Sequence, residues 1–171
     1  NIQIKNLMFA IVAAYLSKLK IKNILNSINK IKPINGRLEK VGVIKNKSKV
    51  ILDYAHTPDA LKTVILNIKE DYPHSKISIV FGCGGNRDKN KRFMMGAIAN
   101  KYCDKIYITD DNPRNENPKN IRKTLKKYCP NGFEISNREK AILLAISNLD
   151  FNDILIIAGK GHENYQLIKN K

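Results

Sequence analysis

Residues Asp153 to Gly159 read DILIIAG, in which five consecutive apolar residues lie between an acid and a glycine. A strand with one face in water alternates apolar and polar residues, so this continuous run is typical of a strand that helices cover on both faces. Two more apolar runs, KISIVFG (Lys76–Gly82) and KIYIT (Lys105–Thr109), also have strand character. Together the three runs predict a buried and mainly parallel sheet.

Helical segments alternate with these strands along the chain. The dipeptides Thr57-Pro58 and Asn117-Pro118 each supply a good N-cap and first helical residue. Ser136 and Glu139 have the spacing of a capping box. The predicted helices are Pro58–Glu70, Lys91–Tyr102, Pro118–Cys129 and a segment through KAILLAI (Lys140–Ile146). This alternation predicts an α/β fold with a mainly parallel sheet flanked by helices.

The first part of the chain differs from the rest. Apolar residues recur at helical spacing from Leu7 to Leu19 and again from Ile21 to Ile28. The stretch KPINGR (Lys32–Arg37) then brings proline and glycine together, and the strand candidates GRLEKVGVI and KVILDYAH follow it. We therefore predict a boundary, with a helical part at residues 1–35 and an α/β part at residues 36–171.

Composition and charge exclude several classes of protein. The 171 residues are 43% hydrophobic and 27% charged, as in globular proteins, and the apolar stretch Leu7–Leu16 is too short to span a bilayer. The formal net charge is +16, but lysines are spread through every segment without interleaved aromatic residues. A solvated lysine surface is therefore favoured over nucleic-acid binding. Cys83, Cys103 and Cys129 form neither a zinc motif nor a closed disulfide set, which favours a reducing cytoplasm.

Unusual residues gather where the predicted strands end. The four strand exits read DYAHTP (Asp53–Pro58), GCGGNRDKNKR (Gly82–Arg92), TDDNPR (Thr109–Arg114) and AGKGHE (Ala158–Glu163). In open α/β sheets, ligands bind beyond the carboxyl ends of the strands. We therefore expect the four loops to assemble one pocket.

The glycine-rich exit favours an anionic ligand, because backbone N–H groups at a helix N-terminus bind anions. Arg87, Lys89, Lys91 and Arg92 strengthen that interpretation. A tight strand-to-helix turn that needs positive φ explains the glycines as well. His162 has no nucleophile motif beside it, and no metal-ligand spacing relates the histidines of the chain.

The four exits carry both signs of charge. Exposed ion pairs add only about 0–1 kcal/mol, so stability alone is a weak reason to gather charged side chains. A zwitterionic ligand such as an amino acid would present its carboxylate to arginine and its ammonium to the acids. The alternative is a surface network that satisfies itself. The charged residues in question are Arg87, Arg114, Asp110, Asp111, Glu116 and Glu163.

Four motifs, in their order and spacing, resemble the C-terminal part of the Mur ligase family: DYAHTPDALK, VFGCGGNRDKNKRFMMGAIA, TDDNPRNE and IAGKGHENYQ. The likeness extends from about Asn1 to Lys171. It implies a Rossmann-like domain at residues 36–171, preceded at residues 1–35 by the last helices of a central ATP-binding domain. The chain contains no GxxxxGK[ST] phosphate loop, so the resemblance implies a fragment that is inactive alone.

The resemblance also implies an activity, the ATP-dependent addition of meso-diaminopimelate to UDP-MurNAc-dipeptide, which is UDP-N-acetylmuramoyl-L-alanyl-D-glutamate. The implied cofactors are ATP and Mg²⁺, both held mostly by the upstream domain. A cytoplasmic monomer without nucleic-acid or membrane partners is expected. The alternative is a stand-alone nucleotide- or amino-acid-binding module without catalysis.

Site residues are implied by the same resemblance. The pattern D-N-P-R, at Asp111–Arg114, is associated with meso-diaminopimelate rather than with L-lysine. No catalytic residue and no metal ligand is implied within this chain, and the family usually has Asp where this chain has Asn86. The residues implied for meso-diaminopimelate are Arg87, Asp111, Asn112, Arg114, Gly159 and Glu163, and those implied for the nucleotide are Asn6, Arg37, Asp53 and His56.

Overall fold

A computed structural model gives the structure of the protein and describes residues 2–32, 34–44 and 46–169. The chain divides into two compact units, Asn1–Ile34 and Asn35–Lys171. Pro33, which belongs to the predicted boundary, lies outside the described residues. Among the described residues, no helix combines the length and the apolar composition needed to cross a membrane.

The first unit is a pair of helices, α1 (Ile2–Leu16) and α2 (Ile21–Ile28). Helices were predicted here from the apolar spacing. Large apolar side chains such as Phe9 and Leu16 remain exposed, by 74% and 73%, and α2 has no buried residue among those described. This helix pair therefore buries little apolar surface of its own.

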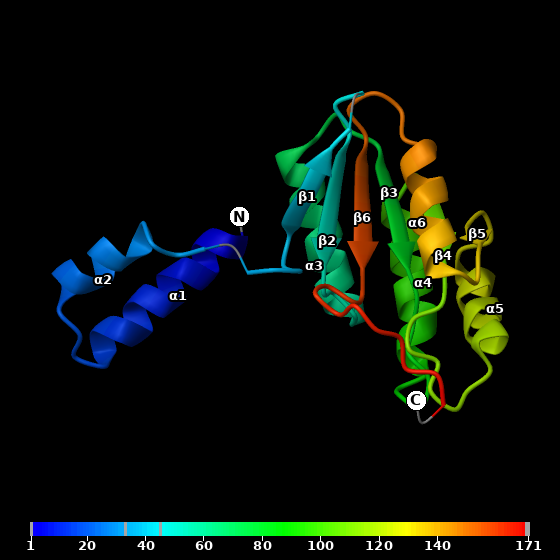
Figure 1. The fold of residues 1–171 in the computed structure, drawn as a ribbon, viewed down its shortest axis with the longest axis horizontal. Helices are drawn as coiled ribbons and strands as arrows, with labels where there is room; N and C mark the ends of the chain where they lie inside the picture. The colour runs from blue at the N-terminus through cyan, green and yellow to red at the C-terminus, as the bar shows by residue number, and fades with distance from the viewer. Residues whose placement is uncertain (1, 33, 45, 170–171) are drawn as a thin grey trace. The chain divides into compact units, whose positions relative to one another are not determined.

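The second unit is built on a sheet, which has six strands among the described residues, in the order β1-β2-β6-β3-β4-β5. The edge strand β1 pairs antiparallel with β2, and every other neighbouring pair is parallel. Figure 1 shows β6, the last strand in sequence, between β2 and β3. The strands are β1 (Glu39–Val43), β2 (Lys49–Asp53), β3 (Ile77–Phe81), β4 (Lys105–Ile108), β5 (Phe133–Glu134) and β6 (Ile154–Ala158).

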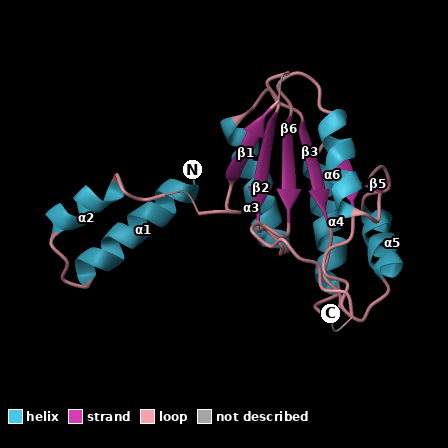
Figure 2. Ribbon diagram, viewed as in Figure 1, coloured by secondary structure: helices cyan, strands magenta, loops and turns pink. Residues whose placement is uncertain are grey.

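Helices cover both faces of this sheet, as the apolar strands predicted (Figure 2). Alternate residues of β6 point to opposite faces. Ile154 and Ile156 pack in the core that α3, α4 and α5 share, whereas Leu155 and Ile157 pack in a smaller core with α6. These helices are α3 (Pro58–Asp71), α4 (Asn90–Tyr102), α5 (Pro118–Tyr128) and α6 (Arg138–Ser147). The predicted α/β fold is confirmed.

The helix starts follow the predicted caps with one exception. The Thr57 and Asn117 side chains accept backbone hydrogen bonds at the starts of α3 and α5, and proline follows each of them. The capping box at Ser136 was wrong, because α6 begins one residue later. Asn137 is the N-cap, and its Oδ1 accepts from Lys140 N at 2.9 Å. The Ser136 carbonyl instead accepts from Thr109 Oγ1 at 3.2 Å, which ties this turn to the end of β4.

Candidate substrate-binding site

The loops that follow β3 and β4 interlock along their length. Gly85 N donates to Asn112 O at 2.9 Å, and Arg114 Nη1 donates back to Gly85 O at 3.0 Å. Asn86 bridges the same pair of loops, since its N donates to Glu116 Oε1 at 2.6 Å and its Oδ1 accepts from Asn115 N at 2.9 Å. Each loop therefore holds the other in place at the edge of the sheet.

Two residues of these loops have left-handed backbone, Asn86 with φ 51° and Arg114 with φ 50°. Asparagine adopts this conformation more readily than other residues with a side chain, which suits Asn86 to its position. Arg114 is held there from outside the loop, because its N donates to Leu167 O at 3.0 Å and its O accepts from Lys169 N at 2.7 Å. A backbone held in this region by its surroundings is frequent at functional sites.

The charges of the loops divide into internal pairs and cleft-lining groups. Asp110 pairs with Arg122, and Glu116 pairs with Arg92 at 2.9 Å. Arg92 is only 4% exposed and also donates to Gly84 O, so it has little access to an external anion. The expectation that Arg92 helps to attract an anionic ligand was wrong, because burial and the Glu116 carboxylate engage its guanidinium.

The Glu116 carboxylate gives the unit a testable dependence on pH. The hydrogen bond from Arg92 lowers the pKa of Glu116 below its ordinary value of 4.5. The stability from this ionised group is therefore present above pH 4.5 and lost as the pH falls through the folded-state pKa. At pH 7, Glu116→Gln is expected to lower the free energy of unfolding by about 1–3 kcal/mol, since Arg92 loses its charged acceptor. Urea titration of both chains measures this.

The same comparison at lower pH separates this ion pair from a general packing effect. The difference between Glu116→Gln and the unsubstituted chain is expected to shrink as the pH falls below 4.5. Glu70→Gln, at an exposed position of α3, is the matched control and should change stability little at either pH. A loss that stays constant from pH 7 to pH 3 would contradict the assignment.

The four strand exits converge on one cleft of about 390 Å³. The prediction that these loops assemble one pocket is confirmed by the residues that line it. The pocket lining contains all six residues that the resemblance implied for the amino acid, together with His56. The lining residues are Tyr54, His56, Thr57, Gly82, Gly84, Arg87, Asp88, Lys91, Asp111, Asn112, Arg114, Gly159 and Glu163.

Gly159 lets the backbone of β6 leave the sheet beside Asp111. Its φ is 107°, and a Cβ at this position would lie 3.2 Å from Asp111 Oδ2. A side chain would therefore strain the backbone and crowd a carboxylate of the cleft. The glycine keeps this wall of the cleft free for a ligand.

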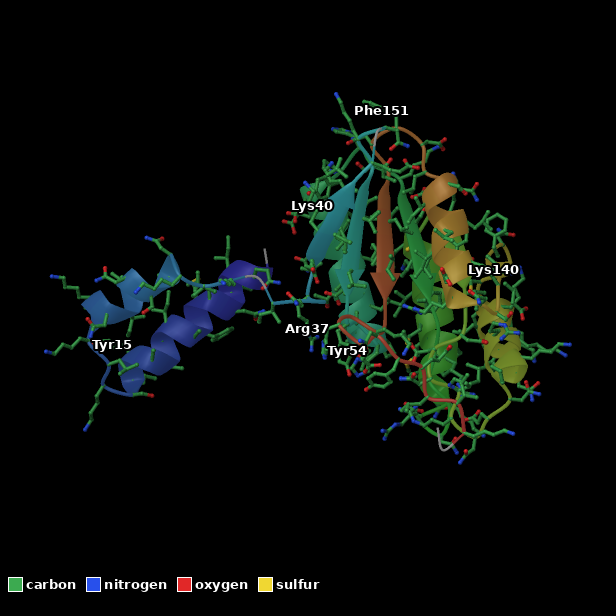
Figure 3. All side chains as sticks on the ribbon, viewed as in Figure 1. Tyr15, Arg37, Lys40, Tyr54, Lys140 and Phe151 are labelled. Atoms are coloured by element: carbon green, nitrogen blue, oxygen red, sulfur yellow. The ribbon has the colours of Figure 1, made fainter. Side chains whose placement is uncertain are left out.

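An aromatic cluster lies at the β2 end of the site. The Arg37 guanidinium lies 4.7 Å from the centre of the Tyr54 ring, and the two side chains appear together in Figure 3. His56 packs edge-on against this ring at 4.7 Å, and His162 stacks with it at 5.8 Å. Tyr54 Oη also donates to Glu163 Oε1 at 3.4 Å. Tyr54 thus connects residues proposed for the nucleotide with one proposed for the amino acid.

Of the residues implied for the nucleotide, only His56 lines the cleft among the described residues, and Arg37 and Asp53 do not. Asp53 is buried, and its two carboxylate oxygens accept from Leu38 N at 2.8 Å and Ala55 N at 2.7 Å. It therefore holds the segment before β1 against the end of β2, a role that the sequence did not predict. Asn6 lies on α1 of the first unit and is exposed there.

Two cations beside the cleft, the buried Lys160 and the half-buried Arg138, were missed by sequence reasoning as site residues. Lys160 is 6% exposed and contacts Asn112 and Glu163. Arg138 Nη2 donates to Ala158 O at 2.8 Å, while Nη1 has no hydrogen-bond partner among the described residues. Burial lowers the pKa of Arg138, and the charges of Asp111 and Glu163 oppose that shift. The acids of the cleft are thus backed by positive charge.

The thiol within the glycine loop is not a nucleophile. Cys83 is buried against Met95, and burial raises the pKa of its thiol to about 12. A protonated thiol is a weak nucleophile and a poor metal ligand at neutral pH. Across the described ranges, no cluster of three or more histidine, cysteine or acidic residues could hold a metal ion. The cleft lining itself carries charged side chains of both signs.

Comparison with known proteins places the chain in a family. The family described as "Mur ligase, glutamate ligase domain" matches residues 36–161. The chain therefore belongs to the Mur ligase family, as the four motifs predicted.

Two curated relatives of this chain share one name within the family. The UDP-N-acetylmuramoyl-L-alanyl-D-glutamate–2,6-diaminopimelate ligase of Rickettsia typhi is 44% identical over 174 residues, which cover 100% of this chain and 35% of the relative. The ligase of the same name from Buchnera aphidicola is 45% identical over 171 residues, covering 98% of this chain and 34% of the relative. The chain spans about a third of the length of the curated relatives it matches.

Solved structures agree with the fold. A structure of a UDP-N-acetylmuramoyl-L-alanyl-D-glutamate–2,6-diaminopimelate ligase is 34% identical, with a TM-score of 0.72, and covers 99% of this chain and 35% of that one. The UDP-N-acetylmuramate–alanine ligase of Thermotoga maritima is 18% identical, with a TM-score of 0.68, over 93% of this chain and 34% of that one. The second likeness shows the fold alone.

Proposed function

We propose that the chain is the amino-acid-binding part of an ATP-dependent ligase that joins meso-diaminopimelate to UDP-MurNAc-dipeptide. The observation that carries this proposal is the cleft itself, where the loops after β3, β4 and β6 bring together Arg87, the pair Asp111 and Arg114, and Glu163. Diaminopimelate carries two ammonium and two carboxylate groups, so both signs of charge are needed to hold it. The names of the relatives support the same substrate pair.

The reaction is amide formation through an acyl phosphate. ATP phosphorylates the γ-carboxylate of the D-glutamate, the diaminopimelate amine attacks the acyl carbon, and phosphate leaves while ADP is the other product. Arg114 and Asn112 hold the distal carboxylate, and Asp111 and Glu163 hold ammonium charge. This chain supplies orientation, and a well-oriented amine can lower the barrier by about 7–11 kcal/mol.

The nucleotide and its metal are bound mostly by a domain that precedes these residues in the proposed ligase. Mg²⁺ offsets the charge of the transferring phosphoryl group when it is bound. We infer that its ligands belong mostly to that preceding domain. Arg37 and His56, at the β2 end of the cleft, are the groups proposed to approach the nucleotide from this side.

A ligase assay tests this proposal. With ATP, Mg²⁺ and UDP-MurNAc-dipeptide, the complete ligase is expected to form the amide product with meso-diaminopimelate and little product with L-lysine, as measured by mass spectrometry. The absence of any diaminopimelate product would overturn the proposed reaction. Equal use of the two amino acids would overturn the proposed specificity while leaving the reaction class in place.

The 171-residue chain by itself is expected to hydrolyse no ATP. Its sequence contains no GxxxxGK[ST] loop to cradle the phosphates. Phosphate release measured with and without the purified chain, in the presence of diaminopimelate and Mg²⁺, checks this expectation. Phosphate release above the buffer rate, persisting through repeated purification, would show that phosphoryl-transfer groups lie within these residues.

A further inference from the structure

The buried side chain of Lys160 uses its ammonium group entirely inside the protein. Nζ donates to Asn112 Oδ1 at 2.9 Å and to the Tyr165 carbonyl, and it lies 3.5 Å from Glu163 Oε2. A lysine ammonium has three donors, and these three acceptors match them. Lys160 is not among the residues that line the cleft, whereas two of its partners, Asn112 and Glu163, are. A ligand in the cleft would therefore contact these partners and not Lys160 itself.

The hydrogen bond from Lys160 fixes the orientation of the Asn112 carboxamide, that is, the side on which its oxygen and its NH₂ group lie. Asn112 Oδ1 accepts from Lys160 Nζ and also from Leu167 N at 2.9 Å, and both of these groups can only donate. Reversing the carboxamide would set its NH₂ group against two donors in a buried place, which is costly. Nδ2 must therefore point the other way, toward Glu163 Oε2 at 3.3 Å.

The cleft side of Asn112 is consequently a hydrogen-bond donor. Its Nδ2 carries two N–H bonds, of which one reaches Glu163 and the second has no bond to another described residue. Arg114, which lines the same cleft, is also a donor only. A ligand carboxylate meets these two donors, whereas a bare methylene group gains nothing from them and an ammonium is held only by the neighbouring carboxylates of Asp111 and Glu163.

We propose that Lys160 is a positioning residue that fixes the polarity of Asn112 and thereby makes this end of the cleft select a carboxylate. The inference rests on the proposed function and deepens it, because it assigns the discrimination between diaminopimelate and L-lysine to a side chain that touches neither. Lysine lacks the distal carboxylate, so it gains nothing from the Asn112 donor. Removing Lys160 should therefore harm the use of diaminopimelate selectively.

The first test is Lys160→Met in the complete ligase, since methionine keeps similar length without donors. The kcat/KM for meso-diaminopimelate is expected to fall roughly ten- to a hundredfold, the effect of losing hydrogen bonds that involve a charged group. The kcat/KM for L-lysine and the KM for ATP should stay within about threefold. Lys40→Met, at an exposed position of β1, is the matched control and should leave all three unchanged.

The ratio of kcat/KM for diaminopimelate to that for L-lysine is the decisive quantity. A merely structural loss lowers the use of both amino acids alike and leaves the ratio constant. An unchanged ratio in Lys160→Met, with the unsubstituted ligase active on diaminopimelate, would overturn this inference alone. Failure of the unsubstituted ligase to form the diaminopimelate product would overturn the proposed function and this inference with it.

Asn112→Asp tests the same idea without removing the buried cation. An aspartate keeps an acceptor for Lys160 Nζ and Leu167 N, but it replaces the Nδ2 donor by a second acceptor. The new carboxylate faces Glu163, but Lys160 Nζ lies within 3.5 Å of both acids and offsets their repulsion, so this variant is expected to fold and to lose the preference for diaminopimelate. It provides the test if Lys160→Met does not fold. A preserved preference in Asn112→Asp would contradict the assignment.

Discussion

Replacing Arg114 by alanine in the complete ligase is expected to raise the KM for meso-diaminopimelate about a hundredfold, with the KM for ATP unchanged within about threefold. Arg114 uses Nη1 for the carbonyls of Gly85 and Asn112. A guanidinium has five donors, so others are left for the carboxylate that we propose Arg114 binds. Losing a two-point charged contact of this kind costs about 1.5–3 kcal/mol, which is ten- to a hundredfold or more in binding.

Arg114→Lys sharpens the interpretation of this result. Lysine keeps the positive charge but cannot form the forked contact, so its KM for diaminopimelate should lie between those of the unsubstituted and alanine forms. Steady-state kinetics with each substrate varied in turn measures all of these constants. Parallel increases in the KM for ATP and for diaminopimelate would show that Arg114 supports the loop as a whole and has no particular contact with the amino acid.

Replacing Gly85 by alanine is expected to cost about 3 kcal/mol of folding stability, the upper end of the usual range for overpacking. A Cβ on Gly85 would overlap the Pro113 carbonyl oxygen, and it would lie 2.8 Å from the carbon of that carbonyl. Both atoms belong to the backbone of the neighbouring loop, which cannot rotate away as a side chain can. The free energy of unfolding from urea titration of the 171-residue chain measures the loss.

Gly42→Ala is the matched control for this substitution. Gly42 lies in the edge strand β1, where an added Cβ meets nothing within 4 Å. Since glycine weakens a strand by about 0.5–1 kcal/mol relative to alanine, this control should be neutral or slightly stabilising. Equal stability of Gly85→Ala and the unsubstituted chain would mean that the loops after β3 and β4 can separate without cost.

The sheet was predictable because its strands are buried on both faces. A run such as Ile154–Ala158 has no polar residue to compete with a strand assignment, and β3 and β4 are apolar apart from Ser78 and Lys105. Strand β5 escaped prediction because its residues Phe133 and Glu134 are exposed and form only a short pairing with β4. The start of α6 was misplaced because Ser136 and Asn137 are both good caps, and tertiary contacts chose between them.

The cleft was predictable to the extent that strand ends meet at one edge of a parallel sheet. The glycines and charged residues at those strand ends are visible in the sequence, and several of them line a common cleft in the structure. The partners of each charge could not be read, because they come from distant parts of the chain. Lys160 and Asn112 are 48 residues apart, and Arg92 and Glu116 are 24 apart. Only the folded chain shows that Arg92 is an internal partner while Arg114 faces the cleft.

The position of β6 has a consequence for how the protein acquires its shape. Strands β2 and β3 do not pair with each other, and both pair with β6, which comes about a hundred residues after β2 in sequence. During synthesis, the two halves of the sheet, the β1–β2 pair and the strands β3 to β5, can therefore join into one sheet only after β6, the last strand, has been made. Such long-range parallel pairing is slow to form. Because the loops of the cleft belong to both halves, binding competence and completion of the fold should arise in the same kinetic step.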